Sequence, residues 1–162
     1  MKKRNILPGQ ESVWNYPRPP KLEPTSAELV VIFAGEVIAR TCRGFRVLET
    51  SHPPSYYFPP EDVRLDLLQQ LTRRSFCEFK GYATYWSIEV DGHRAEEAAW
   101  SYTNPTSSYL PIKGYISFYA SRVDECFVNG EKVEPQEGDF YGGWITSNIV
   151  GPFKGGAGTL GW

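Results

Sequence analysis

The sequence of 162 residues contains no apolar run close to the ~20 residues that a membrane-spanning helix needs. Its start, MKKRNILPGQ, is basic but has no apolar segment of ~7–15 residues, so it does not predict a secretory signal. The net charge is only −2, which gives no global electrostatic reason to expect binding to nucleic acid or to an anionic membrane. We therefore expect a cytoplasmic domain with neither kind of partner.

The chain also lacks paired metal ligands and a disulfide framework. Its three cysteines, Cys42, Cys77 and Cys126, lie far apart, and its two histidines, His52 and His93, stand singly. None of them falls at the C-x2-4-C or H-x3-5-H spacing of a structural zinc site. An odd number of scattered cysteines is typical of reduced thiols in a cytosolic protein. No metal and no other cofactor is predicted.

Two catalytic or nucleotide-binding motifs are incomplete or absent. The segment KGGAGT at residues 154–159 is similar to a phosphate-binding loop, but Thr159 follows Gly158 directly, so the lysine that would reach the phosphates is missing. Such a loop also needs a helix after it, and only Leu160, Gly161 and Trp162 follow. No G-x-S-x-G occurs, which argues against a hydrolase with a nucleophile elbow.

Composition and proline placement predict one domain, residues 1–162, in three parts. Hydrophobic residues make up 41% and charged residues 22% of the chain, as in a typical globular domain. Residues 1–26 hold five prolines and so form neither a helix nor a central strand; we expect an extended arm whose Trp14 and Tyr16 lie on the protein body. Residues 27–134 form a β core, and residues 135–162, with eight of the fifteen glycines, form a C-terminal strap.

Short apolar or alternating runs predict a mainly β (α+β) fold. Strands are expected at residues 29–34, 37–41, 45–50, 76–80, 82–90, 93–102, 116–119, 123–128 and 131–134. Asp91-Gly92 and Asn129-Gly130 each separate two such runs, which predicts tight two-residue hairpins.

One short helix is predicted at residues 61–71, directly after Pro60. Its apolar stripe consists of Val63, Leu67, Leu68 and Leu71. A single helix cannot supply several crossover connections, so the sheets are expected to be antiparallel.

Glu49 and His52 place a carboxylate and an imidazole at the end of one predicted strand. Glu49 points the same way as Val47, which would bring the carboxylate into a partly buried environment. A buried carboxylate needs partners, for which Lys80, Arg64 or a hydroxyl group could serve. Two interpretations stay open: an ion pair that fixes the loop, or a polar contact in a pocket.

Cys77 is the candidate nucleophile. Lys80 is close in sequence, and its ammonium group could lower the pKa of the thiol. In a regular strand, however, Cys77 and Lys80 point to opposite faces, so their contact would need a bulge. The other interpretation is a small buried residue that faces the core.

Aromatic residues are abundant, at 15% of the chain. Most of them must fill the core of a twisted sheet. A few around one concavity would form a site for a flat or cationic ligand. Tyr57, Trp86 and Trp100 stand near loops and are the predicted walls of such a site.

Several long segments resemble the bacterial and fungal family called DUF427, a domain of unknown function. The matching segments are ESVWNYPRPP (11–20), LETSHPPSYYFPPEDVRLDLL (48–68), SFCEFKGYATYW (75–86), AAWSYTNP (98–105) and FYGGWITSNIVGPFKGGAGTLGW (140–162). Together they cover nearly the whole chain. The first and last are similar to the longer form of the family, which carries the arm and the strap.

The resemblance implies a fold of two antiparallel sheets pinned along one edge, described as Mss4-like or β-tent. Metal-containing β-tents use two cysteine pairs, which this sequence does not have, so the resemblance implies no zinc here. The family is also labelled a nucleotidyltransferase, an activity that needs a carboxylate pair holding Mg²⁺ near a Gly-Ser loop. The only near candidates are Asp62 and Asp66, with no Gly-Ser partner.

These patterns lead to two hypotheses and identify no reaction. The first is a small-molecule pocket in which His52 is a base or donor, Lys80 contacts an anion, Glu49 completes the polar set, and Tyr57, Trp86 and Trp100 form the walls. The second is a protein-interaction module, with a homodimer as one possibility, that uses the arm, the strap and a sheet edge.

Overall fold

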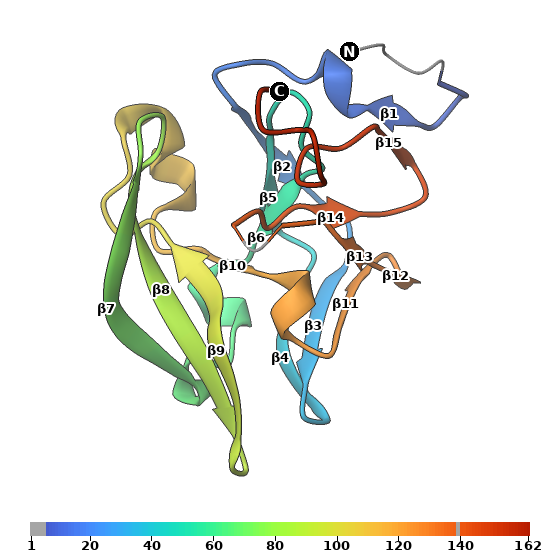
Figure 1. Cartoon of the computed structure of the whole chain (residues 1–162). Helices are drawn as coiled ribbons and strands as arrows, with labels where there is room; N and C mark the ends of the chain where they lie inside the picture. The colour runs from blue at the N-terminus through green and yellow to red at the C-terminus, as the bar shows by residue number, and fades with distance from the viewer. Residues whose placement is uncertain (1–5, 139) are drawn as a thin grey trace.

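Two four-stranded antiparallel sheets frame the domain in the computed structural model, which describes residues 6–138 and 140–162 (Figure 1). The first has the order β10-β9-β8-β7 and consists of β7 (Leu68–Cys77), β8 (Gly81–Val90), β9 (His93–Ser101) and β10 (Ile116–Phe118). The second has the order β12-β11-β3-β4 and consists of β3 (Leu29–Phe33), β4 (Glu36–Thr41), β11 (Glu125–Val128) and β12 (Glu131–Lys132). The two sheets diverge on either side of β10 (Figure 1).

A third sheet and two short strand pairs complete the β structure of the described residues. The third sheet has the order β2-β5-β6, with β2 (Lys21–Thr25), β5 (Gly44–Leu48) and β6 (Ser55–Tyr57). The pairs are β1 (Glu11–Ser12) with β15 (Ile149–Val150), which is parallel, and β13 (Glu134–Pro135) with β14 (Trp144–Ile145). The prediction of a mainly β fold with antiparallel sheets is confirmed.

Both predicted hairpins are confirmed. Asp91-Gly92 joins β8 to β9 with φ angles of 46° and 84°, and Asn129-Gly130 joins β11 to β12 with φ angles of 49° and 79°. Positive φ at both central residues is the requirement of a type I′ turn, whose twist matches that of the flanking strands. A third such turn, Ala34-Gly35, joins β3 to β4.

The predicted helix at residues 61–71 is wrong. This segment contains two 3-10 turns, η2 (Pro60–Asp62) and η3 (Leu65–Leu67), followed by the start of β7. Leu68 and Leu71 are both half-buried, but on opposite faces of β7: Leu68 packs against the core between the two main sheets, and Leu71 packs against the buried cluster on the other side of the first sheet. Burial of leucines on both faces of a strand therefore produces the apolar spacing that resembles one face of a helix.

The remaining helical segments of the described chain are also 3-10 turns. They are η1 (Val13–Asn15), η4 (Ser107–Ile112) and η5 (Ala120–Arg122). None of the described helices is long and apolar enough to cross a membrane.

The N-terminal arm lies on the protein body. Its first five residues are outside the described part of the chain, and Trp14 and Tyr16 pack in a small cluster with Leu48 and Ile149. Pro24 sits in β2, an edge strand, where the missing N–H removes no central ladder bond.

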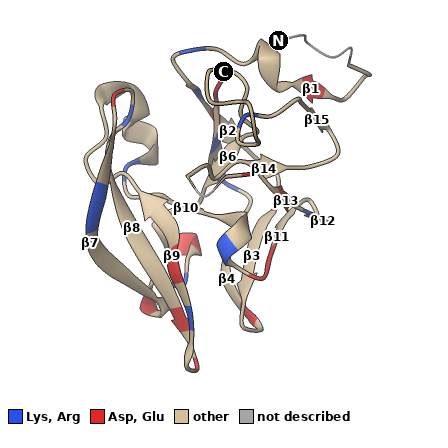
Figure 2. Ribbon diagram, viewed as in Figure 1, with Lys and Arg blue, Asp and Glu red and all other residues tan. Residues whose placement is uncertain are grey.

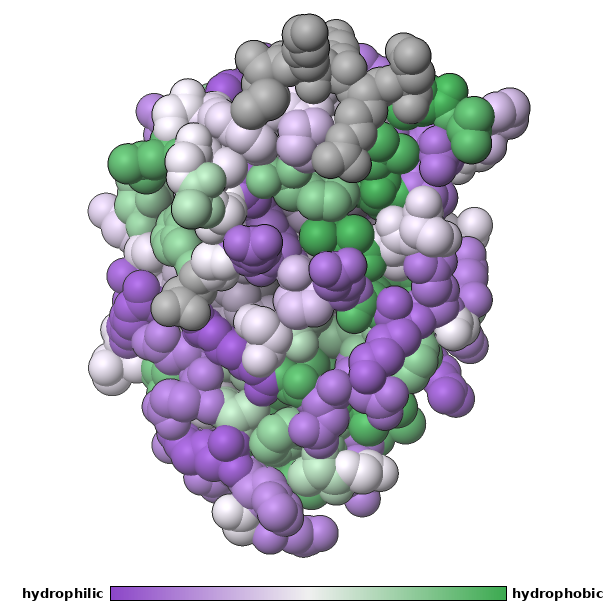
Figure 3. Space-filling model, turned by 45° about the vertical axis from the view of Figure 1, so that its right-hand side comes forward, coloured by the Kyte–Doolittle hydropathy of each residue, from purple (hydrophilic) through white to green (hydrophobic). Residues whose placement is uncertain are grey.

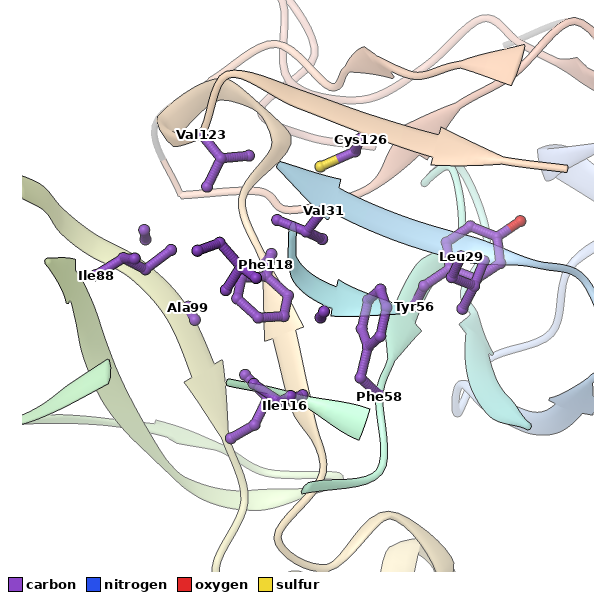
Figure 4. Packing of buried hydrophobic residues seen from close by; sticks show 14 of the residues in the cluster. Leu29, Val31, Tyr56, Phe58, Ile88, Ala99, Ile116, Phe118, Val123 and Cys126 are labelled. Atoms are coloured by element: carbon purple, nitrogen blue, oxygen red, sulfur yellow. The ribbon is translucent and has the colours of Figure 1, made fainter. Parts of the chain in front are cut away.

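The main core fills the space between the two four-stranded sheets (Figure 4). Phe118 of β10 lies centrally, with Ile88 and Ala99 of the first sheet on one side and Val31 of the second sheet on the other. Its ring meets Phe58 edge-on at a centroid distance of 5.5 Å. These side chains are almost completely removed from water, which is the main stabilising term for a domain of this size.

The strap is part of this core through Trp144. That side chain is completely buried, and its indole Nε1 donates a hydrogen bond to the carbonyl oxygen of Phe118 over 3.0 Å. Its ring also packs against Tyr56 and Phe58 at centroid distances of 5.2 and 6.1 Å. The C-terminal segment is therefore held by the same core as the sheets.

Charged residues are distributed over the whole molecule. Arginines lie on β7 and glutamates on β9 of the same sheet (Figure 2), and Arg73 of β7 pairs with Glu97 of β9 over 3.2 Å. The face shown in Figure 3 mixes hydrophilic and hydrophobic residues. This distribution agrees with the small net charge of the sequence.

Arg46 is the central charge of the contact between the arm and the third sheet. Its guanidinium group lies 2.8 Å from Glu11 of β1 and 2.7 Å from Glu23 of β2, and only 14% of the side chain is exposed. Tyr16 donates a hydrogen bond to Glu11 over 2.6 Å. Burial raises the pKa of Tyr16, and the bond to Glu11 raises it further, so the phenol keeps its proton.

Replacing Arg46→Ala is expected to lower the free energy of unfolding by about 1–3 kcal/mol, because two partly buried carboxylates lose their shared partner. Urea denaturation measures this change. Arg64→Ala is the matched control, since Arg64 and its partner Asp66 are at least half exposed, and it should change stability by less than about 1 kcal/mol. Equal losses in the two variants would contradict a structural role for the Arg46 cluster.

Candidate functional site

A cavity of about 400 Å³ lies on the other face of the β8–β9 pair, where these strands meet the third sheet and the strap. Val47 and Tyr57 line it from β5 and β6, while Tyr85 and Trp100 line it from β8 and β9. The turn after β7 and residues of the strap close the remaining sides. A volume of this size suits a small-molecule site.

Five of the six predicted site residues line this cavity: Glu49, His52, Tyr57, Lys80 and Trp100. They come from the end of β5 and its following loop, β6, the turn after β7, and β9. Segments that are up to about fifty residues apart in sequence are thus brought to one place.

Trp86 does not line the cavity, so its prediction as a wall is corrected. It packs against the main core, and its indole Nε1 donates to the hydroxyl group of Ser101 over 2.9 Å. Neighbouring residues of a strand point to opposite faces, so Tyr85 lines the cavity in place of Trp86. The sequence indicates this placement of Trp86, because it alternates in phase with Ile88 and Val90, which belong to the main core.

Four buried aromatic residues, Tyr57, Tyr85, Trp100 and Tyr119, form one wall. Trp100 pairs with Tyr85 across β8 and β9, and its indole Nε1 donates to the hydroxyl group of Tyr57 over 3.1 Å. The ring of Tyr119 lies 4.6 Å from that of Trp100, and the ring of Tyr57 meets Trp100 edge-on at 6.1 Å. Burial raises the pKa of both Tyr57 and Tyr119, so their phenols stay protonated.

Lys80 enters the cavity from the turn that ends β7. The strand expected at residues 76–80 ends at Cys77, and the Lys80 amide donates to the Cys77 carbonyl oxygen over 3.2 Å. Gly81, with a φ of 106°, then starts β8 in a conformation that favours glycine. This turn lets both Cys77 and Lys80 line the same cavity, which a regular strand would not allow.

The ammonium group of Lys80 has no carboxylate partner within 4 Å in the described part of the chain, although only 9% of the residue is exposed. Its Nζ lies 6.0 Å from the ring centre of Tyr102 and 5.9 Å from that of Tyr109. The faces of aromatic rings stabilise a cation without neutralising it. Lys80 therefore offers its positive charge to the cavity.

Glu49 lies on the face of β5 that Val47 shares, as the alternation predicts, and both line the cavity. No ion pair joins Glu49 to Lys80 or Arg64 within 4 Å, and Arg64 instead binds Asp66 and Glu36. The interpretation of Glu49 as half of a loop-fixing ion pair with either residue is therefore wrong.

His52 is held by a strap residue that the sequence does not single out. The Nε2 of Gln136 lies 3.1 Å from Nδ1 of His52, and Gln136 is 4% exposed. The ring of Tyr141 lies 5.2 Å from that of His52. Burial lowers the pKa of His52; Glu49 opposes this effect, whereas Lys154, Arg18 and Lys80 add to it.

The strap supplies five further lining residues that sequence reasoning missed: Gln136, Phe140, Tyr141, Gly142 and Lys154. A Cβ atom at Gly142 would lie 2.2 Å from the Trp100 ring, so the strap backbone rests directly on that ring. A Cβ at Gly143 would lie 2.6 Å from Oε1 of Gln136 and from the Pro53 carbonyl oxygen. The pair Gly142-Gly143 is the sequence feature that could have indicated this contact, because glycine allows the backbone to approach other groups closely.

No group of three or more histidine, cysteine or acidic side chains is placed to hold a metal ion in residues 6–138 and 140–162. Asp62 and Asp66, the candidate carboxylates for a nucleotidyltransferase, bind Arg43 and Arg64 over 3.0 and 2.9 Å at the surface. The hydrogen bonds from Arg43 and Thr41 lower the pKa of Asp62. Neither carboxylate lines the cavity.

Comparison with known protein families matches residues 21–129 to the family described as Domain of unknown function (DUF427). The match covers more than half of the chain, which therefore belongs to this family. The search for relatives among curated proteins finds no match. The family match ends before the strap residues that close the cavity.

Stability should fall as the pH drops below about 6.5, because the unfolded chain binds a proton at His52 more readily than the folded chain does. His52→Gln should reduce this slope of the free energy of unfolding, measured by urea denaturation between about pH 5 and 8. His93→Gln is the matched control, since His93 is exposed, and it should keep the slope. An unchanged slope in His52→Gln would show that the imidazole is not held neutral by the fold.

Proposed function

We propose that the protein is a cytoplasmic small-molecule-binding domain whose ligand occupies the cavity at Trp100. In this proposal Tyr57, Tyr85 and Trp100 form the walls, Lys80 contacts an anionic group, and His52 and Glu49 supply further polar contacts. One observation carries it: a lysine that is nine-tenths buried lines an aromatic cavity and has no carboxylate within 4 Å among the described residues.

A buried, uncompensated charge is costly for the fold. Isolated ammonium groups lose much of their hydration when they leave water, and the rings of Tyr102 and Tyr109 recover only part of it. A ligand anion would recover more, because a desolvated charge pair gains electrostatic energy in a low-dielectric site. A lysine at this position, with no carboxylate within 4 Å among the described residues, is better suited to binding an anion than to stabilising the fold.

A thermal-unfolding screen of the wild-type protein against a metabolite library tests the proposal. A ligand present at ~100 times its dissociation constant should stabilise the protein by about 2.7 kcal/mol. Lys80→Ala should lose this stabilisation while remaining folded, and Lys113→Ala, at an exposed position, should keep it. If no compound stabilises the wild type, or if hits stabilise both variants equally, the cavity is not the proposed binding site.

A protein-interaction role is the second candidate, and an exposed aromatic pair favours it. Phe76 and Tyr82 face each other across β7 and β8 with a ring-centre distance of 5.0 Å, and they are 64% and 59% exposed. β7 is the edge strand of its sheet. Exposed aromatic residues beside a free strand edge are suited to self-association.

Under this second candidate the wild type should form a homodimer, and Phe76→Lys should convert it to a monomer, because an edge-strand lysine opposes pairing. Sedimentation velocity over a range of concentrations measures the change. Leu65→Lys, at another exposed apolar residue, is the control and should leave the dimer intact. A wild type that stays monomeric at all concentrations excludes this candidate.

A further inference from the structure

We infer that Gln136 holds His52 in the tautomer with its proton on Nε2, and that the cavity therefore selects a ligand that carries an aromatic ring and a carboxylate. This inference rests on the proposed function, because it specifies the ligand of the same cavity. Gln136 acts as a positioning residue, since it contacts His52 and is not required to touch the ligand.

The hydrogen bonds of Gln136 fix the orientation of its amide group. The backbone N–H of Gly143 donates to Oε1 over 3.1 Å, and Nε2 donates to the carbonyl oxygen of Lys154 over 2.7 Å. A carbonyl oxygen only accepts and an N–H only donates, so the amide cannot be turned around without losing both bonds. The second hydrogen of Nε2 is then directed to His52.

This orientation decides the tautomer of His52. Its Nδ1 lies 3.1 Å from a donor and must present a lone pair. A neutral imidazole with a lone pair on Nδ1 carries its proton on Nε2. Nε2 has no hydrogen-bond partner among the described residues, so His52 lines the cavity as a donor rather than as a base at that nitrogen.

Several other groups around the cavity also donate, although the carboxylates of Glu49 and Glu78 line it as acceptors. Lys80 has only N–H groups, and the phenols of Tyr57 and Tyr119 keep their protons because burial raises their pKa. Lys154 places a second ammonium group in the lining, over the ring of Tyr141 at 5.8 Å. The Lys154 ammonium donates to the carbonyl oxygen of Trp162 over 3.1 Å, whereas Lys80 has no carboxylate within 4 Å among the described residues. The free donors of Lys80 and His52 therefore favour a negatively charged acceptor on the part of the ligand that they contact.

The walls and the lining side chains narrow the class of anion. No arginine is present among the described lining residues, and the helical segments of the described chain are short 3-10 turns. Phosphate groups are most often bound by arginine forks or helix N-termini, so a carboxylate fits better. The aromatic wall around Trp100 favours a flat ring on the same ligand.

The tautomer of His52 can be measured by nitrogen NMR in a protein that differs from the wild type only at His93. The chain has only two histidines, so His93→Gln leaves a single imidazole, that of His52, in the nitrogen NMR spectrum. We expect a protonated Nε2 and an unprotonated Nδ1. In Gln136→Glu the carboxylate only accepts, so the proton should move to Nδ1 or the ring should become doubly protonated. A proton on Nδ1 in the wild type overturns the inference, whether or not the variant folds.

Ligand selectivity is the second test. Benzoate, phenylacetate and indole-3-acetate are titrated against the wild type, together with their neutral amides and with phenethylamine as a cation. The indole N–H signal of Trp100, assigned by its loss in Trp100→Phe, reports occupancy of the cavity. At least one carboxylate should shift this signal and bind at least about tenfold more tightly than its amide, a difference of about 1.4 kcal/mol.

Two substitutions then assign the selectivity. Lys80→Gln should abolish the preference for the carboxylate over its amide, whereas Lys113→Gln should retain it. Equal binding of acids and amides, preferred binding of the amine, or no shift with any carboxylate overturns the inference. The metabolite screen decides the proposed function separately, because a hit that depends on Lys80 but is not an aromatic carboxylate supports binding without supporting this ligand class.

Discussion

The burial of Trp144 is the constraint on which the rest of the structure depends. A tryptophan from the C-terminal strap is completely buried in the core between the two main sheets and donates its indole hydrogen bond to Phe118 of β10. The strap is therefore fixed from inside the domain. Because Gly142 and Gly143 directly precede Trp144, the same anchoring places their backbone against Trp100 and Pro53. One buried side chain thus connects the stability of the core to the closure of the cavity.

The β8–β9 pair separates two environments. One face carries Ile88 and Ala99 in a dry core, and the other carries Tyr85 and Trp100 at a cavity with polar groups. The strict alternation of side chains along a strand makes this division possible within a few residues. The fold can therefore tolerate a buried lysine on one face while the opposite face supplies the hydrophobic stabilisation.

Local signals in the sequence predict much of the fold and part of the site. Asp91-Gly92 identifies its hairpin because the turn chemistry is contained in two residues. The helix at residues 61–71 is wrong because distant segments bury Leu68 and Leu71 on opposite faces of one strand, and the resulting spacing imitates that of a helix. Glu49 is placed by alternation, but Gln136 reaches His52 only through the folded strap, and no local pattern encodes that contact.

The boundary between the family match and the strap has a consequence for how recognition can diversify. Residues 21–129 contain the two main sheets except β12, together with the Lys80 turn, whereas Gln136, Tyr141 and Lys154 belong to the segment beyond them. Without that segment the face of the Trp100 ring that Gly142 now covers would be exposed to water. Under the proposed function, substitutions in the segment after residue 129 would change the ligand that the cavity binds, while the sheets that carry its aromatic wall stay the same.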